Sequence, residues 1–165
     1  MPMTLPEGAP ATLGEAFARI NACTAPSILD LKVMVLVEAA GQTLYDVSAE
    51  GTDHPEVKRL LIENGVEEMK HAHRVSAAIK AISGEDFVPP SRADNPYLQA
   101  DFPRAKLTPE GLRGTAQAEF GGDALYGKWA DSTDNAEAAA LFRLNGKEET
   151  EHGDRLMQAA ALLEG

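Results

Sequence analysis

The chain has 165 residues, of which 44% are hydrophobic and 25% charged, and its formal net charge is −11. Its length and composition are typical of a single globular domain with its own core, and its acidity argues against binding to a nucleic-acid backbone or an anionic membrane surface. The single cysteine, Cys23, excludes an intrachain disulfide and a four-cysteine metal site, and it fits a reducing cytoplasm.

The first 23 residues are predicted to form a peripheral arm with a short helix near residues 12–21. They contain no basic stretch followed by an apolar run, so we expect no signal peptide. The longest apolar run, Val33–Val37, is far too short to span a bilayer. We therefore expect a cytoplasmic protein with no membrane partner.

Four long helices are predicted in the remainder, residues 24–165, which we expect to form the folded unit. At 1.5 Å per residue, helices of about 25–30 residues are about 40 Å long, the size found in helical bundles. No segment alternates convincingly as a strand. The expected ranges are 24–50, 53–82, 108–132 and 134 to nearly the C-terminus.

Capping residues mark where these helices should start. Thr24 or Ser27 can cap the first helix, and Thr108 followed by a proline can cap the third. The sequences DHPE (53–56) and DNAE (134–137) are interpreted as capping boxes that open the second and fourth. The short connections within each pair predict two antiparallel hairpins.

A proline-rich segment, residues 83–107, separates the two hairpins and cannot be a continuous helix. It is long enough to run the length of a bundle and place the hairpins side by side. A disordered linker between domains is the alternative. Four apolar side chains that could anchor the segment favour the crossover: Phe87, Tyr97, Leu98 and Phe102.

The two halves of the chain are internal repeats at an offset of 81 residues, as from Glu38 to Glu119. Each half, about 26–82 and 108–163, contains E-x6-Y followed by E-x-x-H. On a helix, the glutamate and histidine of E-x-x-H share one face. The matched pairs are Glu38/Glu119, Tyr45/Tyr126, Asn64/Asn145, Glu67/Glu148, Glu68/Glu149, His71/His152 and Arg74/Arg155.

The repeat predicts a dinuclear metal site. A lone E-x-x-H is usually surface chemistry, but six such residues in twofold register are not expected by chance. Four buried carboxylates would repel one another at a cost of several kcal/mol per ion unless protons or cations compensate. Two divalent ions would balance them. The predicted ligands are Glu38, Glu68, His71, Glu119, Glu149 and His152.

With these motifs the chain resembles the ferritin-like superfamily, and within it rubrerythrins and bacterioferritins. The resemblance implies an all-α four-helix bundle built from two repeated hairpins joined by a long crossover. It also implies two iron ions that react with O2 or H2O2, with manganese as a possible substitute. By position, Glu68 and Glu149 would bridge the metals and be central to catalysis. Glu38 and Glu119 would be terminal ligands, and His71 and His152 would each hold one metal.

Further repeated residues surround these ligands. We expect Tyr45 and Tyr126, also candidate catalytic residues, to hydrogen-bond a ligand carboxylate of the opposite hairpin, although ordinary core tyrosines are the alternative. Arg74 and Arg155 could pair with buried acidic groups or with exposed Glu67 and Glu148, and the exposed pairing is preferred. His54 and His73 are not repeated and are interpreted as surface residues, and Trp129 as core.

Four glycines inside predicted helices also recur, although each costs about 1 kcal/mol relative to alanine. Close helix packing is the preferred explanation, and room for a small oxidant or a local helix bulge is the alternative. They are Gly41, Gly65, Gly122 and Gly146.

Two departures from rubrerythrins bear on function. Gly122 stands where that family typically has an additional glutamate, and the chain lacks its four-cysteine rubredoxin domain. We therefore expect a peroxidase or oxidase type of redox protein that needs a separate electron donor. The alternatives are an oxygenase with an organic substrate, which a substrate-sized apolar pocket beside the site would support, iron binding without turnover, and a metal-free structural bundle. A homodimer is expected by analogy alone.

Overall fold

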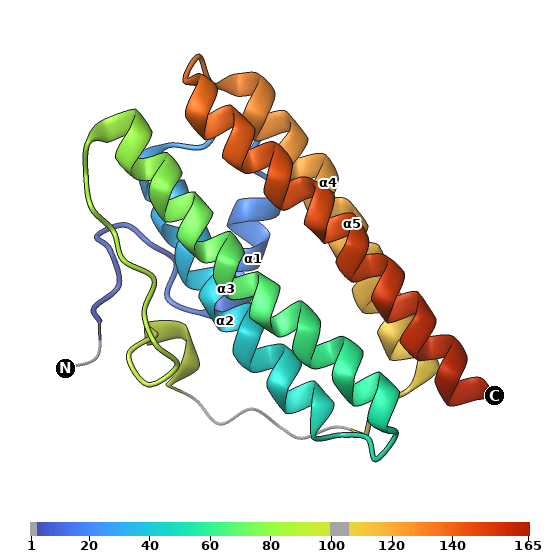
Figure 1. Cartoon of the computed structure of the whole chain (residues 1–165). Helices are drawn as coiled ribbons and strands as arrows, with labels where there is room; N and C mark the ends of the chain where they lie inside the picture. The colour runs from blue at the N-terminus through green and yellow to red at the C-terminus, as the bar shows by residue number, and fades with distance from the viewer. Residues whose placement is uncertain (1–2, 100–105) are drawn as a thin grey trace.

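The structure, a computed structural model, describes residues 3–99 and 106–165, and these residues form five α-helices, one short 3-10 helix and no strand (Figure 1). The all-α prediction is confirmed. Among the described residues, no helix combines the length and the apolar character needed to cross a membrane. The helices are α1 (Leu13–Asn21), α2 (Ile28–Ala49), α3 (Pro55–Ser83), η1 (Pro96–Leu98), α4 (Pro109–Ser132) and α5 (Ala136–Glu164).

The four long helices form two antiparallel hairpins, α2–α3 and α4–α5, which lie side by side (Figure 1). The two hairpins meet mainly where α3 packs on α5, whereas the backbones of α2 and α4 approach each other very little. The bundle is therefore tightly packed on its α3–α5 side and more open on its α2–α4 side. This asymmetry determines how the centre of the bundle can be reached.

Two of the predicted helix caps are confirmed: Ser27 and Thr108 each accept a first-turn N–H. Thr12, which was not predicted as a cap, does the same for α1. The two capping boxes predicted at Asp53 and Asp134 are wrong. α3 is capped by His54, whose Nδ1 accepts from Val57 N at 3.3 Å, and α5 by Asn135, whose Oδ1 accepts from Ala138 N at 2.9 Å. A proline at the first helical position of α3 makes the residue before it the cap, and asparagine caps a helix as well as aspartate does.

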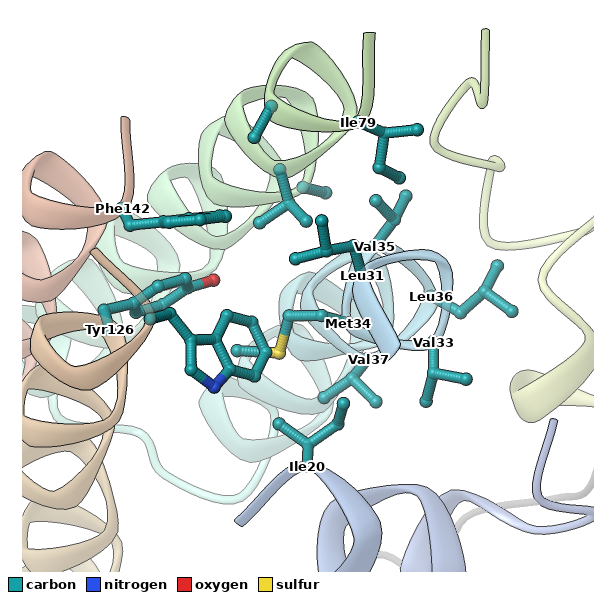
Figure 2. Close-up of a cluster of buried hydrophobic side chains, with 14 of the residues drawn as sticks. Ile20, Leu31, Val33, Met34, Val35, Leu36, Val37, Ile79, Tyr126 and Phe142 are labelled. Atoms are coloured by element: carbon teal, nitrogen blue, oxygen red, sulfur yellow. The ribbon is translucent and has the colours of Figure 1, made fainter. Parts of the chain in front are cut away.

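Residues 33–37 of α2 are buried on all sides, which explains why this stretch is apolar around its whole circumference. Figure 2 shows Ile20 of α1 beside Met34 and Val37, and Tyr126 and Phe142 of the other hairpin nearby. On another side, the buried Asn95 amide donates to Leu36 O at 2.9 Å. The arm and the crossover thus complete the core around α2.

The described part of the crossover is held against the rest of the molecule. Tyr97 is buried and donates from its hydroxyl to Pro10 O at 3.0 Å. Phe87 packs against the core and its carbonyl accepts from Ser76 Oγ at 2.6 Å. Leu98 is half-buried, and Phe102 lies outside the described residues. Phe87 and Tyr97 therefore anchor the segment as expected.

Candidate metal centre

The six predicted ligands meet at the centre of the bundle, on four different helices. α2 provides Glu38 and α4 provides Glu119, while α3 and α5 each provide one glutamate and one histidine. Glu119 is half-buried, and the other five are buried, with both imidazoles fully inaccessible. One E-x-x-H therefore lies on each of the two helices that pack across the hairpin interface.

The candidate ligand atoms form two overlapping groups of four, besides a group of three that joins Glu68 to both histidines. In each group the candidate ligand atoms all lie within 4.8 Å of one another. Glu68 and Glu149 belong to both groups, and each group adds one further glutamate and one histidine. Such sharing is the geometry that two carboxylate-bridged metal ions require. The groups are Glu38, Glu68, His71 and Glu149, and Glu68, Glu119, Glu149 and His152.

Both imidazoles direct Nδ1 into this cluster. His71 Nδ1 lies 3.3 Å from Glu149 Oε1 and 3.7 Å from Glu38 Oε2. His152 Nδ1 lies 3.3 Å from Glu68 Oε1 and 3.5 Å from Glu149 Oε2. The two rings stack at 5.0 Å between centroids, with an interplanar angle of 18°. The imidazoles thus occupy equivalent places in the two halves.

Three buried polar atoms in the cluster have no hydrogen-bond partner within the described part of the chain: His71 Nδ1, His152 Nδ1 and Glu149 Oε2. Buried polar atoms in folded proteins are nearly always satisfied by a partner. All three are atom types that bind metal ions, and they belong to the groups described above. The residues present therefore fit a bound metal.

The outer imidazole nitrogens contact carboxylates of the opposite hairpin. His71 Nε2 lies 3.0 Å from Glu148 Oε2, and His152 Nε2 lies 3.2 Å from Glu67 Oε2. An ionised carboxylate only accepts hydrogen bonds, so it favours the proton on Nε2. In the neutral imidazole the inward Nδ1 then presents its lone pair, which is the tautomer that a metal ligand needs.

The arginines fix these outer carboxylates. Arg74 donates to both oxygens of Glu148 at 2.6 and 3.0 Å, and Arg155 donates to Glu67 at 2.7 Å. Glu67 and Glu148 are indeed the partners, each contacted by the arginine of the opposite hairpin, but the preferred exposed environment is wrong. The side chains of Glu67 and Glu148 are only 16% and 17% exposed, because each ion pair crosses the α3–α5 interface.

Two buried asparagines complete the interface, and sequence reasoning gave them no role. Asn145 Nδ2 donates to His71 O, and Asn64 Nδ2 donates to His152 O, both at 3.2 Å. Their side-chain oxygens accept from Arg74 and Arg155, respectively. Asn64 and Asn145 are themselves a repeated pair, so the repeat contained the signal that could have identified them.

The tyrosines make the contacts predicted for them. The hydroxyl of Tyr45 on α2 donates to Glu119 on α4, and that of Tyr126 on α4 donates to Glu38 on α2. Burial, followed by the nearby carboxylate charges, raises the pKa of both phenols well above the usual range. Each phenol therefore keeps its proton and can hold one glutamate in place.

Without a bound cation, the clustered charges shift the pKa values strongly. Burial and then the surrounding carboxylates raise the pKa of Glu68 and of Glu119 well above the usual range. Burial also opposes ionisation of Glu149, but both imidazoles outweigh it and lower its pKa. Burial alone would lower the pKa of His71, but the effect of Glu149 and Glu38 is larger and raises this pKa to about 10. In the metal-free state, therefore, protons compensate the clustered carboxylates.

The four repeated glycines allow close packing around the site, which agrees with the explanation preferred from the sequence. A Cβ at Gly41 would lie 2.9 Å from Glu68 Oε2, and one at Gly122 would lie 3.3 Å from the Glu149 carboxyl carbon. At Gly65 and Gly146 a Cβ would lie 3.1 and 3.2 Å from a tyrosine Cβ. These glycines let the helices pass close to the bridging candidates and to the tyrosines.

Comparison with known proteins agrees with the site. No curated protein and no solved structure matches the chain. The family model described as Rubrerythrin matches residues 31–160, a range that covers most of the chain and contains all six clustered residues. The chain therefore belongs to the rubrerythrin family.

Proposed function

We propose that this protein binds two iron ions in its central cluster and reacts with O2 or H2O2 as a peroxidase or oxidase. The observation that carries the proposal is the pair of ligand groups that share Glu68 and Glu149. The unpartnered Nδ1 atoms of the two histidines support it, because they face the shared carboxylates. Membership of the rubrerythrin family favours iron over manganese.

The charge of the cluster favours two divalent cations. Four ionised carboxylates carry four negative charges, which two such ions neutralise without any other counterion. Glu68 and Glu149 would contact both ions, while each of the other four ligands would contact one. When bound, the metal pair would supply the redox change that reduces the oxidant.

The surrounding residues would hold the ligands in their binding geometry. Glu148 and Glu67 keep the outer imidazole nitrogens protonated, so that each Nδ1 stays available. The Tyr126 hydroxyl holds the Glu38 carboxylate, and the Tyr45 hydroxyl does the same for Glu119. Because these hydrogen bonds cross between hairpins, the arrangement is preorganised before an oxidant arrives.

Metal analysis of protein purified without chelator tests the proposal. Wild type should contain two irons per chain, and Glu68→Ala/Glu149→Ala should contain none. Glu151→Ala, which removes a glutamate of α5 whose side chain is 44% exposed, should keep both and serves as the control. Circular dichroism should show that all three proteins are folded. No metal in wild type, even after anaerobic reconstitution with ferrous iron, would overturn the proposal.

Kinetics separate turnover from simple binding. With excess H2O2 and a chemical reductant, the iron-loaded protein should consume many equivalents of peroxide per site. A single stoichiometric oxidation would indicate iron binding without turnover. Two manganese ions per chain, with peroxide dismutated in the absence of reductant, would identify a catalase-type centre instead.

A further inference from the structure

A cleft opens between α2 and α4 directly over the central cluster. The two helices run antiparallel, because Tyr45 contacts Glu119 while Tyr126 contacts Glu38. The cleft has a volume of about 600 Å³, and four carboxylates lie along it. These are the four glutamates of the cluster: Glu38, Glu68, Glu119 and Glu149.

The cleft is much larger than O2 or H2O2 requires. A water molecule in the liquid occupies about 30 Å³, and small-molecule binding sites commonly measure roughly 300–1,000 Å³. Gly41 and Gly122 line the cleft beside Glu68 and Glu149, so no side chain from these two positions covers the carboxylates. The dimensions therefore match an organic molecule.

One half of the cleft is apolar. The C-terminal end of α1 lies beside this half of the cleft. It is held there by Trp129 of α4, whose Nε1 donates to the carbonyl of Cys23, two residues after the helix, at 2.8 Å. Figure 2 shows Ile20 approaching Met34 and Val37 in this region. The apolar lining residues of this half are Phe17, Ile20, Met34, Val37 and Leu125.

Lys128 indicates which charge a molecule bound in the cleft would carry. It is the one basic residue among the described residues that line the cleft, and it lies one helical turn after Leu125, at the apolar end. It is exposed and makes no ion pair with any described residue. A carboxylate held at this end of the cleft would pair with Lys128.

We propose that this cleft binds an organic carboxylate with a hydrocarbon body, of the medium-chain fatty-acid class. The carboxylate pairs with Lys128, and the chain extends along the apolar wall toward the glycines beside Glu68 and Glu149. Binding of this molecule requires no metal. Its role as a molecule presented to the metal centre rests on the proposed function.

Calorimetric titration with decanoate tests the cleft, using metal-free and iron-loaded protein. Ala124→Trp places a large side chain in the cleft from an exposed position and should weaken binding at least tenfold. Gln117→Trp makes the same kind of change on exposed α4 surface outside the cleft and should bind as wild type does. Lys128→Gln should weaken binding about three- to fivefold, the effect expected of one exposed ion pair.

The outcomes distinguish this site from the metal centre. Decanoate binding to a protein that takes up no iron would support the cleft while overturning the proposed function. Iron loading and peroxide consumption with no decanoate binding would overturn the cleft and leave the function intact. Equal binding of decanol and decanoate, or an unchanged affinity in Lys128→Gln, would overturn the assignment of an anionic head group.

Discussion

Replacing Glu148 with glutamine should weaken one metal site and leave the other intact. Glu148 Oε2 accepts from both His71 Nε2 and Arg74 Nη1, and Oε1 accepts from Arg74 Nη2. Three donors thus converge on two oxygens. Glutamine replaces one oxygen with an NH2 group, so at least one donor must then face another donor. If that donor is His71 Nε2–H, the proton moves to Nδ1 and blocks the ligand atom.

The size of the effect follows from this geometry. Loss of a carboxylate that orients a metal-bound histidine typically reduces metal affinity about 10–100-fold, which corresponds to about 1.4–2.7 kcal/mol. Only the ion held by His71 should be affected, because His152 depends on Glu67 instead. The matching change Glu67→Gln should weaken the other ion by a similar factor.

An anaerobic titration that resolves two binding steps, with ferrous iron or with cobalt as a spectroscopic probe, measures both affinities. Wild type, Glu148→Gln and Glu67→Gln should be compared with Glu151→Gln, which alters a more exposed glutamate of the same helix. Unchanged affinities in Glu148→Gln would refute the role assigned to the outer carboxylate. Equal weakening of both steps in a folded variant would refute the assignment of one histidine to each metal.

Two further substitutions test the scaffold. Asp30→Asn should destabilise the protein by about 1–3 kcal/mol, because the carboxylate accepts hydrogen bonds from Arg19 Nε at 2.7 Å and from the N–H of the cap residue Ser27. Burial alone would raise the pKa of Asp30. The hydrogen bonds outweigh burial, so the pKa is lowered. The difference from wild type in urea unfolding should therefore be constant above about pH 5 and shrink as pH falls below about 4, where the charge is lost; a constant difference down to pH 2 would contradict the assignment. Gly41→Ala should reduce iron loading, because its Cβ would lie 2.9 Å from Glu68 Oε2, whereas Gly127→Ala, whose Cβ would meet nothing within 4 Å, should keep the iron and gain about 0.5–1 kcal/mol. Equal iron content in the two glycine variants would contradict the close-packing argument.

The fold and the ligand cluster could be predicted from sequence because both depend on spacing along helices. E-x-x-H places Glu68 and His71 on one face, and the repeat at 81 residues supplies the twin of each ligand. Helix starts were less predictable at Asp53 and Asp134. Several residues in those stretches can cap a helix, and the choice depends on the local backbone.

The environment of the arginines could not be predicted because it depends on tertiary structure. The sequence offers Glu67 and Glu148 as possible partners for the arginines, but it does not show that each pair crosses between α3 and α5 and becomes half-buried. The cleft could not be predicted for the same reason, because it too depends on tertiary structure. Its volume depends on the separation of α2 from α4, and no periodicity along a single helix contains that distance.

The two metal sites should form only when the hairpins are docked. Each group of four ligands takes three residues from one hairpin and a fourth from the other, Glu149 in one group and Glu68 in the other. The outer contacts also cross the interface, since Glu148 of α5 supports His71 and Glu67 of α3 supports His152. An isolated hairpin would therefore lack both a complete ligand set and a correctly oriented histidine. Metal binding and hairpin docking would then stabilise each other, so bound ions would hold together an interface that is otherwise rich in buried charge.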